Sequence, residues 1–314
     1  MQYVVPFTEL SKDHVDIAGG KGASLGEMTR AGIPVPPGFV VTAPAFDRFI
    51  EETDLNVEIN AILGKVNVQE IHTIENASEQ IHALILNVAF PEDLGKSIIE
   101  SFHGLNAEYV AVRSSATAED GAEAAWAGQL ESYLNTNEEN LLTNVRRCWA
   151  SLFTPRAIFY RFEKGFSETH VSVAVVVQVM VQSEISGIAF SVHPVTQDYN
   201  QMIIEAGWGL GEAVVSGQIT PDSYVLEKEP RNILDINIAD QERMMVRKSE
   251  GGNEWVDVED NKKAVQKLSG RQIVELSDVI MRIEKHYGFP CDIEWAMQNS
   301  TIYVVQSRPI TTLG

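Results

Sequence analysis

The sequence predicts an α+β protein in which helices prevail in the first half of the chain and strands in the second. Helical patterns with polar connections follow one another between Leu55 and Leu105. A continuous β-branched run from Val171 to Val181 is typical of a buried central strand. Short β-rich segments separated by turns then continue to the end of the chain. We therefore expect two folding units, residues 1–181 and 182–314, which a chain of 314 residues can form.

Glycines and prolines indicate where helices and connectors begin and end in the first unit. Gly32 suits the C-cap of a helix over 23–31, and the prolines of 33–38 predict an extended connector. The small, polar residues 113–128 predict a long functional loop. The remaining patterns predict strands at 39–42 and 109–112 and helices at 45–52, 138–150 and 155–164.

Turn signals divide the second unit into short strands. The run Glu250-Gly251-Gly252-Asn253 predicts a hairpin turn, and 298–300 joins the last two strands. The patterns predict one helix at 269–286 and strands at 188–192, 202–205, 223–227, 233–238, 244–246, 292–297 and 302–306.

Composition and charge exclude several classes of protein. With 44% hydrophobic and 22% charged residues, the chain can bury a core. It has 44 acidic and 24 basic residues, a net charge of −20, so its surface repels nucleic acid and anionic membranes. A phosphate ligand would need a locally basic pocket, helped by a divalent cation.

Neither cysteines nor hydrophobic segments indicate an extracytoplasmic protein. Cys148 and Cys291 are too few and too far apart in sequence for a disulfide framework or a zinc site. The first residues show no secretory signal, and the longest apolar run is too short to cross a bilayer. We expect a cytoplasmic protein.

The first candidate site is the glycine cluster around Lys21, at 19–26. Glycines let backbone N–H groups turn toward an anion, and the following helix adds its positive end. No Ser or Thr follows Lys21 as in a Walker A loop, and Leu25 breaks a G-x-G-x-x-G pattern. A simple glycine turn before a helix explains the cluster equally well.

A second candidate is Arg113, followed by Ser114 and Ser115. An arginine at a strand end beside two hydroxyls suits bidentate recognition of phosphate. The polar residues that follow, up to Asp120, could equally be turn and capping residues.

The last two strands supply a third candidate. Asp292 and Glu294 lie two residues apart and so share a strand face, as do Gln306 and Arg308. A hairpin brings the four together, and oxygen ligands of this kind suit magnesium bridged to nucleotide phosphates. The alternative is a solvated hairpin face.

A fourth candidate lies in 202–214, where a strand carrying Glu205 runs into the glycine-rich turn 207–211. This could be a second phosphate cradle, or its glycines could relieve crowding next to Trp208.

In this order, the four segments resemble the nucleotide-binding region of the phosphoenolpyruvate synthase and pyruvate phosphate dikinase family, a region that rifampicin phosphotransferases share. The resemblance rests on strings along the whole chain. They are GGKGASLGEM (19–28), PVPPGFVVT (34–42), VRSSATAED (112–120), AGQLESYLN (127–135), SGIAFSVHPVT (186–196), EAGWGLGEAVVSG (205–217), CDIEW (291–295) and VVQSRPIT (304–311).

The resemblance implies an ATP-grasp-like fold in which two subdomains clamp ATP, and it assigns roles to single residues. Lys21 and Arg113 would hold the triphosphate, and Arg308 would neutralise charge on the transferred phosphates. Glu294 and Gln306 would coordinate Mg²⁺, with Asp292 close by. The other implied nucleotide contacts are Gly128 and Ser132 in a closing loop and Gln178, Met180 and Val181 at the adenine.

The resemblance also implies what the chain would do. It would be the ATP-activating module of a phosphoenolpyruvate synthase-like phosphotransferase. Phosphate would pass to a histidine on a domain that this sequence lacks, and then to a pyruvate-binding acceptor domain, in cis or in trans. A rifampicin phosphotransferase module is the alternative within this class. A non-catalytic nucleotide-sensing module is the alternative from another class.

Overall fold

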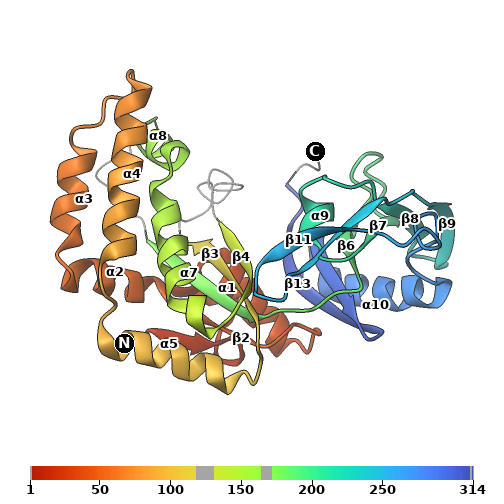
Figure 1. Cartoon of the computed structure of the whole chain (residues 1–314). Coiled ribbons are helices and arrows are strands. Elements are labelled where there is room, and N and C mark those ends of the chain that lie inside the picture. Colours follow the sequence, from red (N-terminus) through yellow and green to blue (C-terminus); the bar gives the residue numbers. More distant parts are fainter. Residues whose placement is uncertain (1, 118–130, 164–171, 312, 314) are drawn as a thin grey trace. The chain divides into compact units, whose positions relative to one another are not determined.

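The computed structural model describes residues 2–117, 131–163, 172–311 and 313 (Figure 1). The chain combines helices with antiparallel sheets, so the predicted α+β class is confirmed, and it divides into two compact units. One unit comprises Met1–Glu27 and Pro37–Met180, and the other comprises Met28–Pro36 and Val181–Gly314. The short segment 28–36 joins the second unit because the Val304 N–H donates to the Pro34 carbonyl at 2.9 Å.

The first unit is built on a five-stranded antiparallel sheet with the order β1-β2-β5-β3-β4. As predicted, the β-branched run forms the central strand, whose residues 173–177 are all fully buried. The strands are β1 (Val4–Pro6), β2 (Gly38–Val41), β3 (Val110–Ala116), β4 (Ser132–Thr136) and β5 (Val173–Val179).

Helices pack on one face of this sheet and form the main core with it. Val112, Val175 and Val177 point into this core, where they meet Trp149 and the apolar sides of the helices. The helices of this layer are α2 (Ala43–Glu52), α3 (Leu55–Leu63), α4 (Ile71–Asn87), α5 (Glu92–Gly104), α7 (Glu138–Ala150) and α8 (Pro155–Glu163), with the 3₁₀ turn η3 (Ser151–Phe153). The predicted helices in these regions are confirmed.

The opposite face of the sheet is covered by α1 (Val15–Arg30), which follows the 3₁₀ turns η1 (Phe7–Glu9) and η2 (Lys12–His14). A Cβ at Gly22 would touch both Val40 and Val176, so this helix packs closely on β2 and β5. The helix begins earlier than the predicted 23–31 because it includes a kink at Gly19, where φ is 65°.

The predicted loop at 113–128 begins later than expected. Residues Arg113–Ala116 belong to β3, because each pairs with a residue of β5 from Val176 back to Val173. Residues 118–130 lie outside the described part of the chain.

The second unit contains a six-stranded antiparallel sheet with the order β13-β12-β6-β7-β8-β9, and β10 and β11 pair as a separate hairpin around the predicted 250–253 turn. All predicted strands are present, but β6 begins three residues earlier, and β7 and β13 each end three residues later. The elements are β6 (Ile185–Phe190), β7 (Gln201–Trp208), α9 (Glu212–Val215), β8 (Asp222–Glu227), β9 (Asn232–Asn237), β10 (Arg243–Arg247), β11 (Asn253–Asp257), α10 (Gly270–Tyr287), β12 (Cys291–Gln298) and β13 (Thr301–Pro309).

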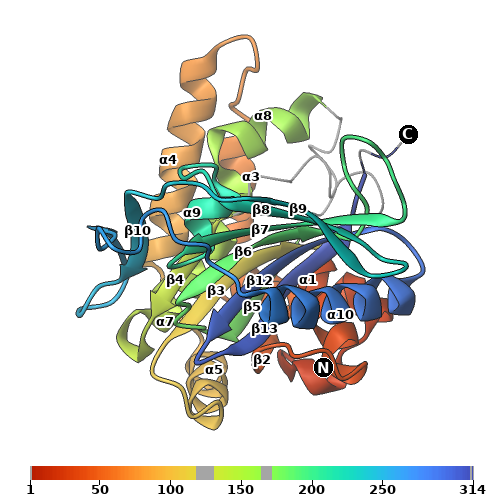
Figure 2. The same ribbon diagram turned by 90° about the vertical axis from the view of Figure 1, so that its right-hand side faces the viewer.

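The long helix α10 runs along one face of this sheet, as Figure 2 shows. Ser269 and Gln272 form a capping box at its start, and Gly288 ends it with φ of 77°. Residues 291, 293, 295 and 297 of β12 are buried, and Met297 contacts Gln272 of the helix. Because side chains alternate along a strand, Asp292 and Glu294 lie on the other face of the sheet.

Candidate functional site

The glycine cluster brings Lys21 into contact with β3. The Lys21 Nζ donates to the Ser114 carbonyl at 2.9 Å. The backbone N–H groups of Lys21 and Gly22 donate to the Ser115 hydroxyl at 3.1 and 3.3 Å. A Cβ at Gly19 would overlap both the hydroxyl and the carbonyl of Ser115. The glycine is therefore required for close approach of α1 to the sheet.

These contacts favour one of the two interpretations of the cluster. An anion cradle needs backbone N–H groups that are open to a ligand, but Ser115 accepts from two of them. Its hydroxyl acts like an N-cap for the helical segment after the kink at Gly19. The structure thus supports a glycine turn before a helix, which places Lys21 beside β3.

Arg113 lies on the same face of the first sheet as Ser115. It pairs with Val176 of β5 on one side and with Ser132 of β4 on the other. Ser132 is exposed and is the first residue of β4, so it belongs to a strand and not to the expected closing loop. Gly128 lies outside the described residues.

The residues expected at the adenine lie at the end of β5. Gln178 is 2% exposed, and its Nε2 has no hydrogen-bond partner among the described residues. The Met180 N–H donates to the Tyr109 carbonyl at 3.0 Å. Val181 follows in the irregular segment before β6 and is 7% exposed. An unpartnered buried amide is costly, so Gln178 is the polar group here that most needs an explanation.

In the second unit, the hairpin of β12 and β13 brings the third candidate together as predicted. Asp292 lies opposite Arg308, and Glu294 lies opposite Gln306. The Arg308 Nε and Nη2 both approach Asp292 Oδ2, at 2.8 and 2.7 Å. The solvated-face alternative fits poorly, because Gln306 is only 7% exposed.

Burial and charge act in opposite directions on Asp292. Burial raises the pKa of its carboxyl, the charge of Glu294 raises it further, and Arg308 lowers it. Its Oδ1 is buried and has no hydrogen-bond partner among the described residues. An orphaned carboxylate oxygen beside a second carboxylate and an amide oxygen fits a hard cation such as Mg²⁺. Within the described ranges, no group of three His, Cys, Asp or Glu side chains is placed to hold a metal ion. An ion at this hairpin therefore needs oxygen ligands in addition to the two carboxylates.

The structure adds Glu205 to this face of the sheet. In the register of β6 and β7, Ala189 lies opposite Ile204 and Ser186 opposite Gly207. Glu205 therefore lies opposite Ile188, which in turn lies opposite Glu294. The sequence placed Glu205 on a strand, but the strand order that puts it in this row depends on long-range pairing.

The glycine-rich turn after Glu205 serves packing. Strand β7 includes Gly207 and Trp208, and α9 after it has only four residues. Gly209 has φ of 88°, and a Cβ there would collide with the backbone of Met245 in β10. The backbone N–H groups of 208–210 donate to the Gln241 side chain and to the Glu184 and Met245 carbonyls, so these contacts favour a packing role for the turn, with the crowding at β10.

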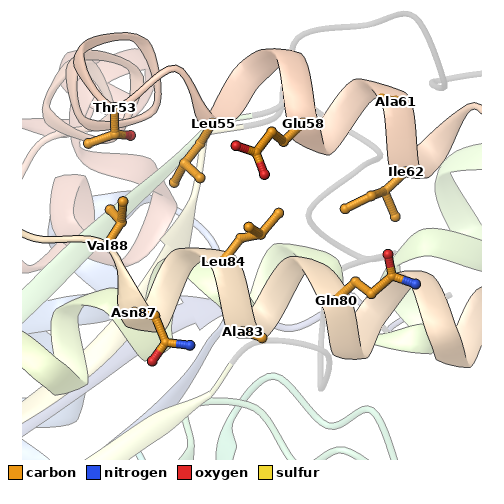
Figure 3. Close-up of a pocket in the computed structure, with 10 residues that line it drawn as sticks. All are labelled: Thr53, Leu55, Glu58, Ala61, Ile62, Gln80, Ala83, Leu84, Asn87 and Val88. Carbon is orange, nitrogen blue, oxygen red and sulfur yellow. The ribbon is translucent and has the colours of Figure 1, made fainter.

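A cavity of about 650 Å³ lies between α3 and α4, away from these groups (Figure 3). Its lining includes the apolar Leu55, Ile62 and Leu84 and the polar Glu58 and Gln80. None of its lining residues is a candidate site residue of the sequence analysis.

Cations, carboxylates and amides gathered on sheet faces are typical of proteins that bind a phosphorylated ligand together with a metal ion. Comparison with known families agrees with this class. Residues 15–314 match the family described as "Pyruvate phosphate dikinase, AMP/ATP-binding domain". The chain belongs to this family, and the family resemblance seen in the sequence is confirmed.

Individual relatives support the same assignment. A probable phosphoenolpyruvate synthase of Methanocaldococcus jannaschii is 48% identical over all of this chain, which spans 27% of that protein. A rifampicin phosphotransferase of Bacillus cereus is 40% identical over 99% of the chain, which spans 36% of it. This chain is thus much shorter than both relatives.

Among solved structures, a D-alanine–D-alanine ligase from Helicobacter pylori covers 76% of this chain and 54% of its own at 11% identity. Its TM-score of 0.31 is too low to carry an argument. In the described ranges of this chain, no helix is long and apolar enough to cross a membrane.

Proposed function

We propose that this chain is the ATP-activating module of a phosphoenolpyruvate synthase-like phosphotransferase, with an ATP-grasp-like clamp formed by residues 1–181 and 182–314. It binds ATP with Mg²⁺ and prepares a phosphoryl group for transfer to a histidine on another domain. The observation that carries this proposal is the cross-strand arrangement of Asp292 with Arg308 and Glu294 with Gln306.

In this arrangement each side chain has a distinct task. Glu294 and Gln306 offer a carboxylate and an amide oxygen to Mg²⁺, and Asp292 offers its orphaned Oδ1. Bound Mg²⁺ would neutralise charge on the phosphates. Arg308 is 59% exposed, so its guanidinium can leave Asp292 in part and neutralise charge that develops on the transferred phosphoryl group.

The first unit supplies the remaining contacts. Lys21 and Arg113 hold the triphosphate as cations, and the hydrogen bond from Lys21 Nζ to the neutral Ser114 carbonyl places this cation beside β3. Ser132, at the start of β4, also contacts the phosphates, as does Gly128. Gln178, Met180 and Val181 receive the adenine. A polar ligand there is supported by the Nε2 of Gln178, which has no hydrogen-bond partner among the described residues.

The acceptor lies outside this chain. We propose a phosphohistidine domain and a pyruvate-binding domain as partners, in cis or in trans, in the cytoplasm. The name of the 48% identical relative supports phosphoenolpyruvate synthesis. The 40% identical relative makes rifampicin the second candidate acceptor. The strong negative charge argues against nucleic acid and anionic membranes as partners.

The proposal is tested by supplying a separate histidine-bearing domain of a relative with labelled ATP and Mg²⁺. We expect acid-labile label on that domain with the wild-type chain and a loss of at least about tenfold with Lys21→Ala or Arg113→Ala. Lys65→Ala, which alters an exposed lysine of the helical layer, is the matched control. Label transfer that is unchanged in both variants contradicts the proposal.

A further inference from the structure

Glu205 is a carboxylate that the proposed phosphate chemistry does not use. It lies on the face of the six-stranded sheet opposite α10, in one row with Gln306, Glu294 and Ile188. On its other side the row continues to Ser223 of β8. Neighbouring strands lie about 4.8 Å apart, so Glu205 and Glu294 are separated by about 10 Å across the row.

The carboxylate of Glu205 is half-buried and lacks a partner. In the described part of the chain, no hydrogen bond or ion pair reaches it. Burial raises the pKa of Glu205. Because Ile188 lies between Glu205 and Glu294 in the row, Glu205 forms a separate position on the same face.

The surroundings of Glu205 limit what it can bind. An ionised carboxylate only accepts hydrogen bonds, so its ligand must donate them. The Ile188 side chain stands between Glu205 and Glu294, which disfavours one metal ion shared by both. A neutral ligand with two adjacent donors matches the two carboxylate oxygens.

We propose that Glu205 is a specificity-determining residue that accepts hydrogen bonds from the two ribose hydroxyls of the nucleotide. This inference rests on the proposed function, because it takes the phosphates to lie over Glu294, Gln306 and Arg308. The ribose is attached to those phosphates and carries two vicinal hydroxyl donors. Hydrogen bonds to a charged acceptor in a half-buried position are strong enough to discriminate ribonucleotides from deoxyribonucleotides.

The backbone supports a fixed position for this side chain. A Cβ at Gly187 of β6 would overlap the Glu205 carbonyl, so only glycine allows this close approach of the two strands. The carboxylate is thus held on a rigid strand, as a specificity contact requires.

The test measures binding of non-hydrolysable ATP and of its 2′-deoxy and 3′-deoxy forms to the full chain with Mg²⁺ by calorimetry. For the wild type we expect the ribonucleotide to bind at least about tenfold more tightly than either deoxy form. In Glu205→Ala the three affinities should agree within about threefold, and Glu205→Gln should fall between. Asp235→Asn removes an exposed carboxylate from β9 and should retain the wild-type ratio.

The outcomes separate this inference from the proposed function. If the wild type binds none of the three nucleotides, the proposed function fails. If it binds them but Glu205→Ala keeps the tenfold ratio, the function stands and the role of Glu205 is wrong. A fold check by circular dichroism accompanies each variant, and Glu205→Gln, which keeps the shape of the side chain, guards against misfolding of Glu205→Ala.

Discussion

Asp292 and Arg308 lie directly opposite each other on β12 and β13, with Arg308 Nη2 2.7 Å from Asp292 Oδ2. The same carboxylate keeps its other oxygen, Oδ1, buried without a partner among the described residues. Arg308 thus neutralises the Oδ2 side of the Asp292 carboxylate, and Oδ1 fits an additional cation. This division underlies the proposed magnesium site.

Loss of Arg308 should destabilise the second unit in a pH-dependent way. We expect Arg308→Ala to lower the free energy of unfolding by about 1–2 kcal/mol at pH 7, because Asp292 is left buried and charged. Removing the cation raises the folded pKa of Asp292 further above its unfolded value. The loss of stability is therefore complete at pH values above the folded pKa of Asp292, and it shrinks as the pH falls toward 4.

Urea denaturation at pH 7 and pH 4 checks this expectation. Arg271→Ala is the control, because Arg271 pairs with Glu275 on the surface of α10 and is 88% exposed. Equal destabilisation of the Arg308 variant at both pH values would contradict the account.

The ion pair of Lys267 and Asp222 should be a strong determinant of stability. Both side chains are 0% exposed, and Asp222 also accepts from the Tyr224 hydroxyl and from the Lys267 and Ala239 N–H groups. Lys267→Met leaves a buried carboxylate without its cation, so we expect a loss of about 3–5 kcal/mol in the free energy of unfolding.

The matched control for this pair is Lys263→Met. Lys263 pairs with Glu242 and Asp260, which are both largely exposed, so this variant should lose far less stability than Lys267→Met. Similar unfolding midpoints in urea for the two variants would show that the buried pair does not have the role assigned to it.

The kink at Gly19 should tolerate no side chain. Gly19→Ala adds a Cβ at φ of 65° that overlaps Ser115, so α1 must move away from β3 and take Lys21 with it. We expect a loss of at least about 2 kcal/mol in the free energy of unfolding and weaker ATP binding. Gly104→Ala, where no atom lies within 4 Å, should change stability by less than about 0.5 kcal/mol. Wild-type stability of Gly19→Ala in thermal melts would refute the close approach.

Replacement of Glu205 should not destabilise the protein at neutral pH. Burial raises the folded pKa of Glu205, so the native state binds more protons than the unfolded state between the ordinary and the raised value. Wild-type stability therefore falls as pH rises through this window. We expect Glu205→Gln to be at least as stable as the wild type at pH 7, with a smaller advantage at pH 4. A variant that unfolds at lower urea concentration than the wild type at pH 7 would point to a structural role for Glu205.

The arrangement of β12 and β13 could be predicted because it depends on local patterns. The turn at 298–300 sets a hairpin, and alternation along each strand puts Asp292, Glu294, Gln306 and Arg308 on one face. A register shift next to Glu294 lies beyond these pairs and does not disturb them. The helices of the first unit follow from equally local signals.

Other features depend on contacts between distant parts of the chain. Arg113–Ala116 has a loop-like composition, but pairing with β5 extends it into a strand. Ser115 accepts from Lys21, 94 residues away, which no local pattern reveals. Likewise, Glu205 enters the row of Glu294 only through the order of β12, β6 and β7. Tertiary pairing overrides local propensity at each of these positions.

The most direct test of the central claim is a calorimetric titration with a non-hydrolysable ATP analogue, with and without Mg²⁺, on the wild type, Glu294→Gln and the exposed control Glu259→Gln. We predict that Mg²⁺ tightens binding to the wild type and to the control at least about tenfold, and that Glu294→Gln loses most of this gain. Binding that is independent of Mg²⁺, or a full Mg²⁺ effect in Glu294→Gln, would contradict a magnesium–nucleotide site at this hairpin.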